Sequence, residues 1–255
     1  MTIGIVDLAL PAATAAAAGL VGSFAVLRRL ALASDALSHV ALPGIGVALL
    51  LHANPLLGGV VALVLGAALI WLVQRRTRLP TEAVVGVIFS AGLAVGSLFT
   101  SGEELLEALL GSSRAAGPVE TGLSLAAAAA IVAWILSARH RLLLALLSED
   151  LARTAGVRVE RLDLVFLLVF ALTTALGLRY LGILLMGSLI IIPAATARLM
   201  SRRLDRMLLT AVLLSVGATL AGTLAASRFG LATGPVIIAL AAALFGVGVL
   251  LRRRG

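Results

Sequence analysis

The sequence has no cysteine and no lysine, and charged residues make up only 13% of its 255 positions. Without cysteine the chain has no disulfide, no thiolate metal site and no catalytic thiol. Without lysine it cannot complete a G-x-x-x-x-G-K-S/T loop, so it cannot hydrolyse ATP by that route. Hydrophobic residues are abundant: they make up 61% of the chain, and the mean hydropathy of the sequence is +1.15. Because a soluble domain is about 45–50% apolar and about 25% charged, this composition excludes a soluble globular enzyme.

The basic residues are all arginine, and they give a formal net charge of +8 and a pI of about 11.6. In a soluble protein such basicity would suggest nucleic-acid binding. Here the arginines separate apolar runs, so a membrane explains them better and we expect no nucleic-acid partner. Residues 3–27 lack a positive leading region, so we expect no cleavable signal there.

Long apolar runs fill almost the whole chain. Every backbone polar group in a membrane must be paired within its own segment, so these runs predict helices. A span needs roughly 20 apolar residues. We therefore predict an all-α, polytopic bundle in a single domain over residues 1–255. The runs lie near residues 4–27, 33–51, 56–74, 82–100, 122–138, 162–178, 181–198, 207–226 and 234–251.

The connections between runs alternate in charge, with 17 arginines on one side and three on the other. This asymmetry places the arginine-rich side and the C-terminus in the cytoplasm. Nine crossings then put the N-terminus outside, in a prokaryotic cell or inner membrane. If the turn at residues 178–181 does not reach the far surface, the count is eight and the N-terminus changes side.

Two ionisable residues, Asp35 and His39, fall inside the second apolar run. Such groups are costly within a span and are functional candidates by default. Four positions apart on a helix, they share one face at a separation of about 6 Å. A carboxylate with an imidazole suits a divalent cation such as Zn²⁺ or Mn²⁺. Pro43 leaves the His39 carbonyl without its usual donor, and Gly44 allows another backbone to come close.

A purely structural role is the alternative to metal binding. The same two residues could form an ion pair or hydrogen bond that locks two helices together. One helix also supplies only two ligands, too few for a complete coordination shell. A two-fold homodimer would bring a second Asp35 and His39 and complete an N₂O₂ set. We therefore expect a homodimer and a metal ion that is bound transiently as cargo, with no resident cofactor and no catalytic residues.

The cytoplasmic loop after the fifth run contains a second candidate site. Ser148 is a favourable N-cap, two acidic residues follow it, and Gly156 suits a helix end. We predict a short helix over residues 149–155, too short to be stable alone. It either docks into a partner groove or packs on its own bundle. The candidate docking residues are Ser148, Glu149, Asp150, Leu151, Ala152, Arg153, Thr154, Ala155 and Gly156.

Four segments of the chain resemble the permease family of ABC-type importers for zinc, manganese and iron. The most specific is D-A-L-S-H-x-x-L-P-G, followed by I-I-P-A-A-T-A-R-L. The segments are LRRLALASDALSHVALPGIGVALLL at 27–51, SEDLARTAGV at 148–157, LGILLMGSLIIIPAATARLM at 181–200 and TGPVIIALAAALFGVGVLL at 233–251. Together with the order of spans, the resemblance covers nearly the whole chain.

The resemblance implies a membrane permease subunit that moves divalent metal ions into the cytoplasm by alternating access. It implies a homodimer, two cytosolic ATP-binding subunits, and an extracellular or periplasmic metal-binding protein. The family's metal-contacting Asp and His fall on Asp35 and His39, and its ATPase-contacting helix falls on 148–157. The subunit itself would not be an enzyme.

Two other functions remain open at this point. One is an ABC permease for a chelate such as haem, a siderophore or cobalamin, which would need a wide channel without ligands. The other is a proton-coupled secondary metal transporter, which would need no ATPase. The sequence does not distinguish among zinc, manganese and iron.

Overall fold

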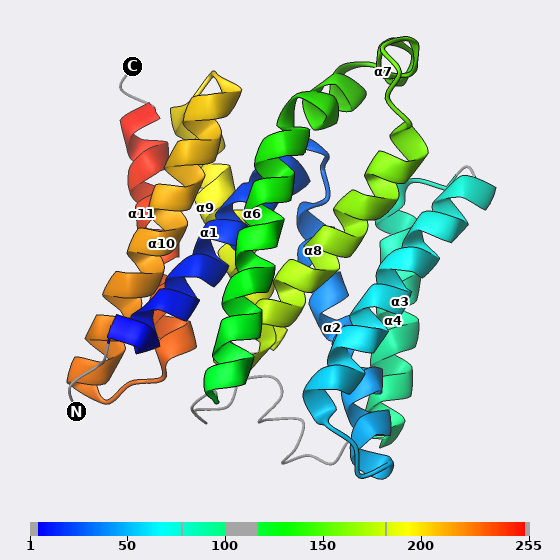
Figure 1. Cartoon of the computed structure of the whole chain (residues 1–255). Coiled ribbons are helices and arrows are strands. Elements are labelled where there is room, and N and C mark those ends of the chain that lie inside the picture. The colour runs from blue at the N-terminus through cyan, green and yellow to red at the C-terminus, as the bar shows by residue number, and fades with distance from the viewer. Residues whose placement is uncertain (1–4, 78, 100–116, 182, 253–255) are drawn as a thin grey trace.

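The computed structural model describes residues 5–77, 79–99, 117–181 and 183–252, and every regular element in these ranges is an α-helix (Figure 1). This confirms the prediction of an all-α fold. The helices are α1 (Ile5–Leu27), α2 (Ala31–Leu50), α3 (Pro55–Arg76), α4 (Thr81–Phe99), α6 (Pro118–Leu147), α7 (Glu149–Thr154), α8 (Val159–Leu181), α9 (Ile183–Met200), α10 (Leu204–Phe229) and α11 (Thr233–Arg252).

Six helices in the described part of the chain are long and apolar enough to cross a membrane, namely α1, α3, α6, α8, α10 and α11. Three shorter apolar stretches lie in α2, α4 and α9, at Leu37–Leu50, Thr81–Gly96 and Met186–Met200. A polytopic membrane protein is therefore confirmed. The count of nine crossings stays a prediction.

Helix starts follow ordinary capping chemistry. Asn54 accepts a hydrogen bond from the Leu56 amide at the start of α3, where Pro55 occupies the first helical position. At the start of α6 the side chain of Glu120 accepts from the Gly117 amide. Such caps satisfy amides that have no partner within the helix.

Helix α6 is longer than the sequence analysis predicts, because it continues past residue 138 to Leu147. The extension reads RHRLLLALL, which contains no glycine or proline and several strong helix formers. The apolar run marks only the part of a helix that lies in lipid. A helix that projects beyond the membrane surface is missed by that criterion.

The corner between α1 and α2 is tight and unusual. The Leu30 amide donates to the Ala25 carbonyl at 2.8 Å and the Arg29 amide donates to the Val26 carbonyl at 3.3 Å, which is the Schellman pattern. Arg29 occupies the left-handed position with φ = 60°, where glycine is the usual residue. An L-residue in this conformation costs about 1–2 kcal/mol. The surrounding contacts must hold it there.

One apolar core runs through the bundle and contains residues from each described helix except α7. Helix α2 packs on both α3 and α4, while α1 packs on α9 and α10. Figure 1 shows α7 at one end of the bundle, at the same end as the C-terminus. Met186 near the start of α9 lies against Gly177 near the end of α8, so these two helices form a hairpin.

Candidate functional site

Helix α2 carries the predicted Asp35 and His39 pair. It runs without interruption from Ala31 to Leu50, with Pro43 inside it. Asp35 lies one turn before His39 on this helix, and its side chain falls outside the described part of the structure. Of this pair, the structure therefore describes the backbone of both residues on α2 and the side chain of His39 alone.

The imidazole of His39 is half-buried and lies against Phe89 of α4. The two ring centres are 5.3 Å apart with an interplanar angle of 66°, an edge-to-face arrangement. The Nδ1 atom of His39 is fully buried and has no hydrogen-bond partner among the side chains that the structure describes. An unpaired buried polar atom is costly, and it is uncommon away from functional sites. His39 is thus held by packing against α4, and the described residues leave its Nδ1 available to a ligand or to Asp35.

Close backbone contacts hold α2 in place. A Cβ atom on Gly44 would overlap the carbonyl oxygen of Gly58 in α3, and one on Gly58 would overlap that of Gly44. This confirms the predicted close approach at Gly44. On the other side a Cβ atom on Gly96 of α4 would lie 3.0 Å from the Cβ of Leu42. Helices in lipid associate by such close approach, since lipid gives no hydrophobic drive.

One protomer does not assemble a complete metal site from the residues that the structure describes. Among these residues no group of three or more His, Asp or Glu side chains lies close enough to share an ion. His52, beyond the end of α2, and His140, in the part of α6 after residue 138, are both exposed. Ser38, a neighbour of His39 in sequence, is fully buried. Further ligands would come from Asp35, from other residues outside the described ranges or from a second chain.

The predicted cytoplasmic helix is present as α7, Glu149–Thr154, one residue shorter than expected. The Ser148 hydroxyl accepts from the Leu151 amide at 3.2 Å, as predicted for an N-cap. Gly156 follows the helix with φ = 79°, a conformation that glycine adopts without strain. Ala152 is buried, whereas the Leu151 side chain is 54% exposed. An apolar side chain is thus available on the surface of a helix that its own bundle covers on one side only.

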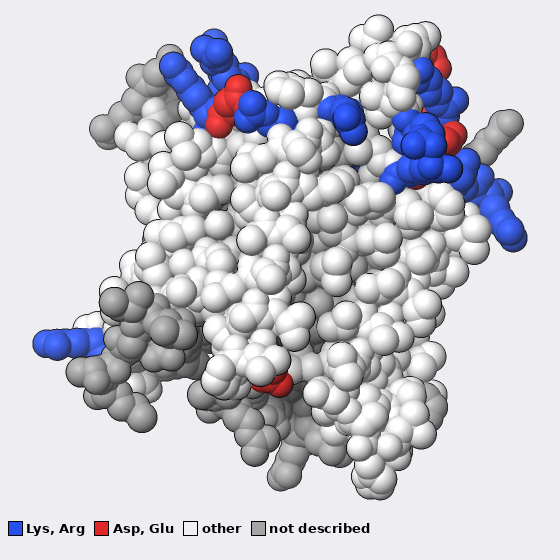
Figure 2. Space-filling view, in the orientation of Figure 1, with Lys and Arg blue, Asp and Glu red and all other residues white. Residues whose placement is uncertain are grey.

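Arginines gather on the end of the molecule that carries α7. Figure 2 shows them there as a broad band, with few acidic side chains beside them. Salt bridges cross this band: Arg153 of α7 contacts Glu160 of α8 at 3.5 Å, and Arg75 of α3 contacts the same carboxylate at 3.6 Å. The Glu160 carbonyl also accepts from Trp71 Nε1 at 2.9 Å. Helices α3, α7 and α8 are thereby linked at the membrane surface.

Three residues of functional interest were missed by the sequence analysis: Phe89, Arg28 and Asp163. Phe89 gave no signal, because nothing in a single sequence says which aromatic residue faces His39. Arg28 contributed only to the charge asymmetry. Its guanidinium binds Asp163, which is 135 positions away in the chain, so no local pattern could have paired them.

The sequence profile of the ABC 3 transport family matches residues 6–252. The manganese transport system membrane protein MntC of Halalkalibacterium halodurans is 29% identical over 234 residues, which cover 90% of this chain and 80% of that protein. The high-affinity zinc uptake system membrane protein ZnuB of Haemophilus influenzae is 30% identical over 244 residues and 91% of both chains. Among solved structures, PsaBC from Streptococcus pneumoniae in complex with Fab matches with a TM-score of 0.81 and 26% identity, covering 94% of this chain and 88% of that chain.

Proposed function

The chain belongs to the ABC 3 transport family, and from this premise we propose that it is the permease subunit of an ABC importer for manganese or zinc. Its relatives of known name are membrane proteins of manganese and zinc uptake systems, and they align over most of their length. The observation in the structure that carries the metal assignment is His39, a half-buried imidazole inside an apolar helix bundle, whose Nδ1 is buried with no partner among the described residues. Imidazole is a ligand that suits zinc and other transition metals.

The subunit is a multi-pass protein of the bacterial inner membrane. Its apolar helices supply the spans, and the arginine-rich end faces the cytoplasm by the positive-inside rule. Helix α7 lies at that end, so it is presented to the cytosol (Figure 1). The metal ion enters from the opposite end.

Asp35 and His39 hold the ion on its way through. A single α2 helix offers one carboxylate and one imidazole, and two copies related by a two-fold axis offer four ligands. Four ligands of N and O type suit Zn²⁺, and Mn²⁺ accepts such a set when water completes it. The ion is cargo, so it must be held loosely enough to leave. A homodimer is therefore part of the proposal.

ATP hydrolysis resides in a partner subunit that binds α7. The chain lacks lysine, so it cannot form the usual phosphate-binding loop. The exposed Leu151 and the surrounding charges of α7 offer an apolar contact with a polar rim, the common form of a protein interface. A metal-binding protein outside the cell delivers the ion.

The alternatives from the sequence are less well supported. Membership of an ABC transporter family disfavours a secondary transporter that works without an ATPase. MntC and ZnuB belong by name to manganese and zinc systems, which disfavours haem, siderophore or cobalamin as cargo. Neither name supports iron.

Uptake in reconstituted vesicles tests the proposal. The chain is co-expressed with its ATP-binding subunit, purified as a complex and placed in liposomes with the metal-binding protein outside and ATP inside. We expect ATP-dependent entry of Mn²⁺ or Zn²⁺, and no entry when ATP is replaced by a non-hydrolysable analogue. Entry of neither metal, or entry driven by a proton gradient without ATP, would refute it.

A further inference from the structure

Arg28, the residue that follows α1, makes the most shielded salt bridge of the described residues. Its Nη1 donates to Asp163 Oδ1 of α8 at 2.6 Å, and the Arg28 side chain is only 13% exposed. In the other described salt bridges both side chains are at least 36% exposed. The Arg28 guanidinium also lies over the Phe166 ring, 4.7 Å from its centre. Helix α8 thus holds this side chain both by charge and by cation–π contact.

The backbone beyond Arg28 leads directly to the helix that carries the predicted metal ligands. Only Arg29 and Leu30 separate Arg28 from α2. Arg29 is held in the left-handed conformation, Leu30 is buried, and both amides are bonded back into α1. A corner this short and this constrained has little freedom to absorb movement. A displacement of Arg28 is therefore passed on to α2.

On the other side, Asp163 sits next to the cytoplasmic helix. It belongs to the second turn of α8, and only residues 155–158 lie between α7 and α8. The salt bridge from Arg153 to Glu160 joins α7 to the start of α8, and the bond from the Val157 amide to the Ala152 carbonyl folds the connecting segment back onto α7. A push on α7 moves the start of α8 with it.

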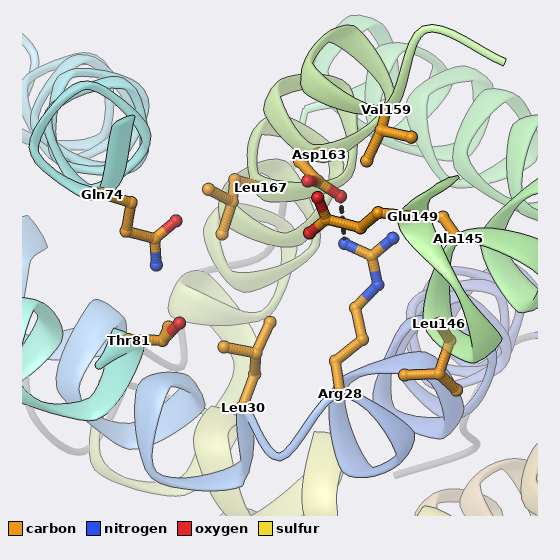
Figure 3. A pocket seen from close by; sticks show the side chains of 10 residues that line it. All are labelled: Arg28, Leu30, Gln74, Thr81, Ala145, Leu146, Glu149, Val159, Asp163 and Leu167. Atoms are coloured by element: carbon orange, nitrogen blue, oxygen red, sulfur yellow. Dashed lines mark hydrogen bonds and ion pairs between the residues drawn. The ribbon is translucent and has the colours of Figure 1, made fainter. Parts of the chain in front are cut away.

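These parts meet around a cavity of about 230 Å³ at the cytoplasmic end. Figure 3 shows Arg28 and Asp163 bonded across it, and the carboxylate of Glu149, the first residue of α7, pointing toward the same guanidinium. Its lining comes from the corner between α1 and α2 and from helices α3, α4, α6, α7 and α8. Both carboxylates and the guanidinium thus line the same cavity.

We propose that Arg28 and Asp163 form the joint through which movement of α7 and α8 reaches α2. Arg28 is then a positioning residue for the Asp35 and His39 helix during transport. Strained backbone such as that at Arg29 persists only where its surroundings hold it, and it concentrates at sites that move or bind. The inference rests on the proposed function, since it assumes that α7 receives the movement of an ATPase.

The test measures two rates in the same liposomes: Mn²⁺ or Zn²⁺ entry and ATP hydrolysis. Arg28→Gln and Asp163→Asn are each expected to lower the metal carried per ATP hydrolysed by about fivefold or more, the lower end of ordinary coupling between sites. The exchanged pair, Arg28→Asp with Asp163→Arg, is expected to recover at least half of the ratio. A residue that only stabilises the fold would lower both rates together and leave their ratio unchanged.

Arg139→Gln is the matched control. Arg139 also makes a salt bridge at the cytoplasmic end, 3.2 Å from Asp205, but that pair joins α6 to α10 and is more exposed. We expect the metal carried per ATP hydrolysed by Arg139→Gln to stay within about twofold of wild type, since exposed salt bridges contribute little to stability. Should Arg28→Gln not assemble with the ATP-binding subunit, Phe166→Leu removes the ring under the guanidinium and is expected to lower the ratio in the same direction.

The outcomes separate the inference from the proposed function. Wild-type liposomes that carry neither metal would refute the proposed function. Wild-type liposomes that carry metal, with an unchanged ratio in Arg28→Gln, Asp163→Asn and Phe166→Leu, would overturn the joint and leave the function standing. The joint would also be overturned if the metal carried per ATP hydrolysed fell in the single variants and did not recover in the exchanged pair.

Discussion

The imidazole of His39 in α2 rests edge-to-face on the ring of Phe89 in α4, with 5.3 Å between the ring centres. This contact orients a side chain whose buried Nδ1 has no hydrogen-bond partner within the described ranges. Ligating histidines are usually oriented by a hydrogen bond from the second ring nitrogen. For the predicted ligand His39, the part of the chain that the structure describes offers an aromatic contact in that place.

Removal of either predicted ligand should stop uptake. Asp35→Ala and His39→Ala are each expected to lower ATP-dependent Mn²⁺ or Zn²⁺ uptake by at least about tenfold, because loss of even an outer partner of a metal ligand costs that much. Assembly with the ATP-binding subunit should be unchanged, as judged by gel filtration. His52→Ala is the control, since His52 is exposed beyond the end of α2. Uptake at the wild-type rate in His39→Ala would show that this imidazole does not hold the ion.

Loss of the Phe89 ring should weaken metal capture more than it slows turnover. An edge-to-face aromatic pair contributes about 0.5–1.5 kcal/mol, so Phe89→Ala is expected to raise the KM for metal about twofold to tenfold. The effect on kcat should be smaller, because the ligands themselves remain. The same substitution at Val87, which is exposed on α4, should leave both constants unchanged. A KM equal to that of wild type in Phe89→Ala would contradict the positioning of His39 by this ring.

A methyl group at the crossing of α2 and α3 should destabilise the protein. Gly44→Ala places a Cβ atom on the Gly58 carbonyl, and overpacking of this kind costs typically about 1–3 kcal/mol. The unfolding midpoint in detergent is then expected to fall by about 2–10 °C. Gly86→Ala in α4 is the control, because a Cβ atom there has nothing within 4 Å. Equal midpoints for the two variants would mean that the crossing is looser than the structure shows.

The sequence predicted those features that repeat along the chain or depend on near neighbours. Apolar runs gave the helices, and the local sequence Ser148 to Gly156 gave α7 to within one residue. The continuation of α6 to Leu147 was missed, since hydropathy measures contact with lipid and not the hydrogen bonding that sustains a helix. Arginine asymmetry gave the two ends of the molecule, as Figure 2 shows.

The site could be predicted only as far as it is local. Asp35 and His39 were found because they lie four positions apart in one apolar run. Phe89 and the Arg28–Asp163 pair depend on how helices distant in sequence pack together, and a single sequence holds no record of that packing. The contact of two chains at His39 would also depend on packing between distant surfaces, and the homodimer stays a prediction.

Loss of the α7 cap should uncouple ATP hydrolysis from metal entry while the complex with the ATP-binding subunit stays assembled. The Ser148 hydroxyl accepts from the Leu151 amide at 3.2 Å, and α7 has only six residues, far fewer than a helix needs to be stable alone. Ser148→Ala costs such a helix about 1 kcal/mol, so amide exchange at Leu151 is expected to be about fivefold faster. Ser137→Ala is the control, because the Ser137 hydroxyl donates to the Trp134 carbonyl within the long helix α6.

If α7 transmits the ATPase movement, a frayed α7 lowers metal entry per ATP hydrolysed in Ser148→Ala but not in Ser137→Ala. Faster exchange with an unchanged ratio would show that α7 need not be ordered for transport, and unchanged exchange would show that the cap does not hold it.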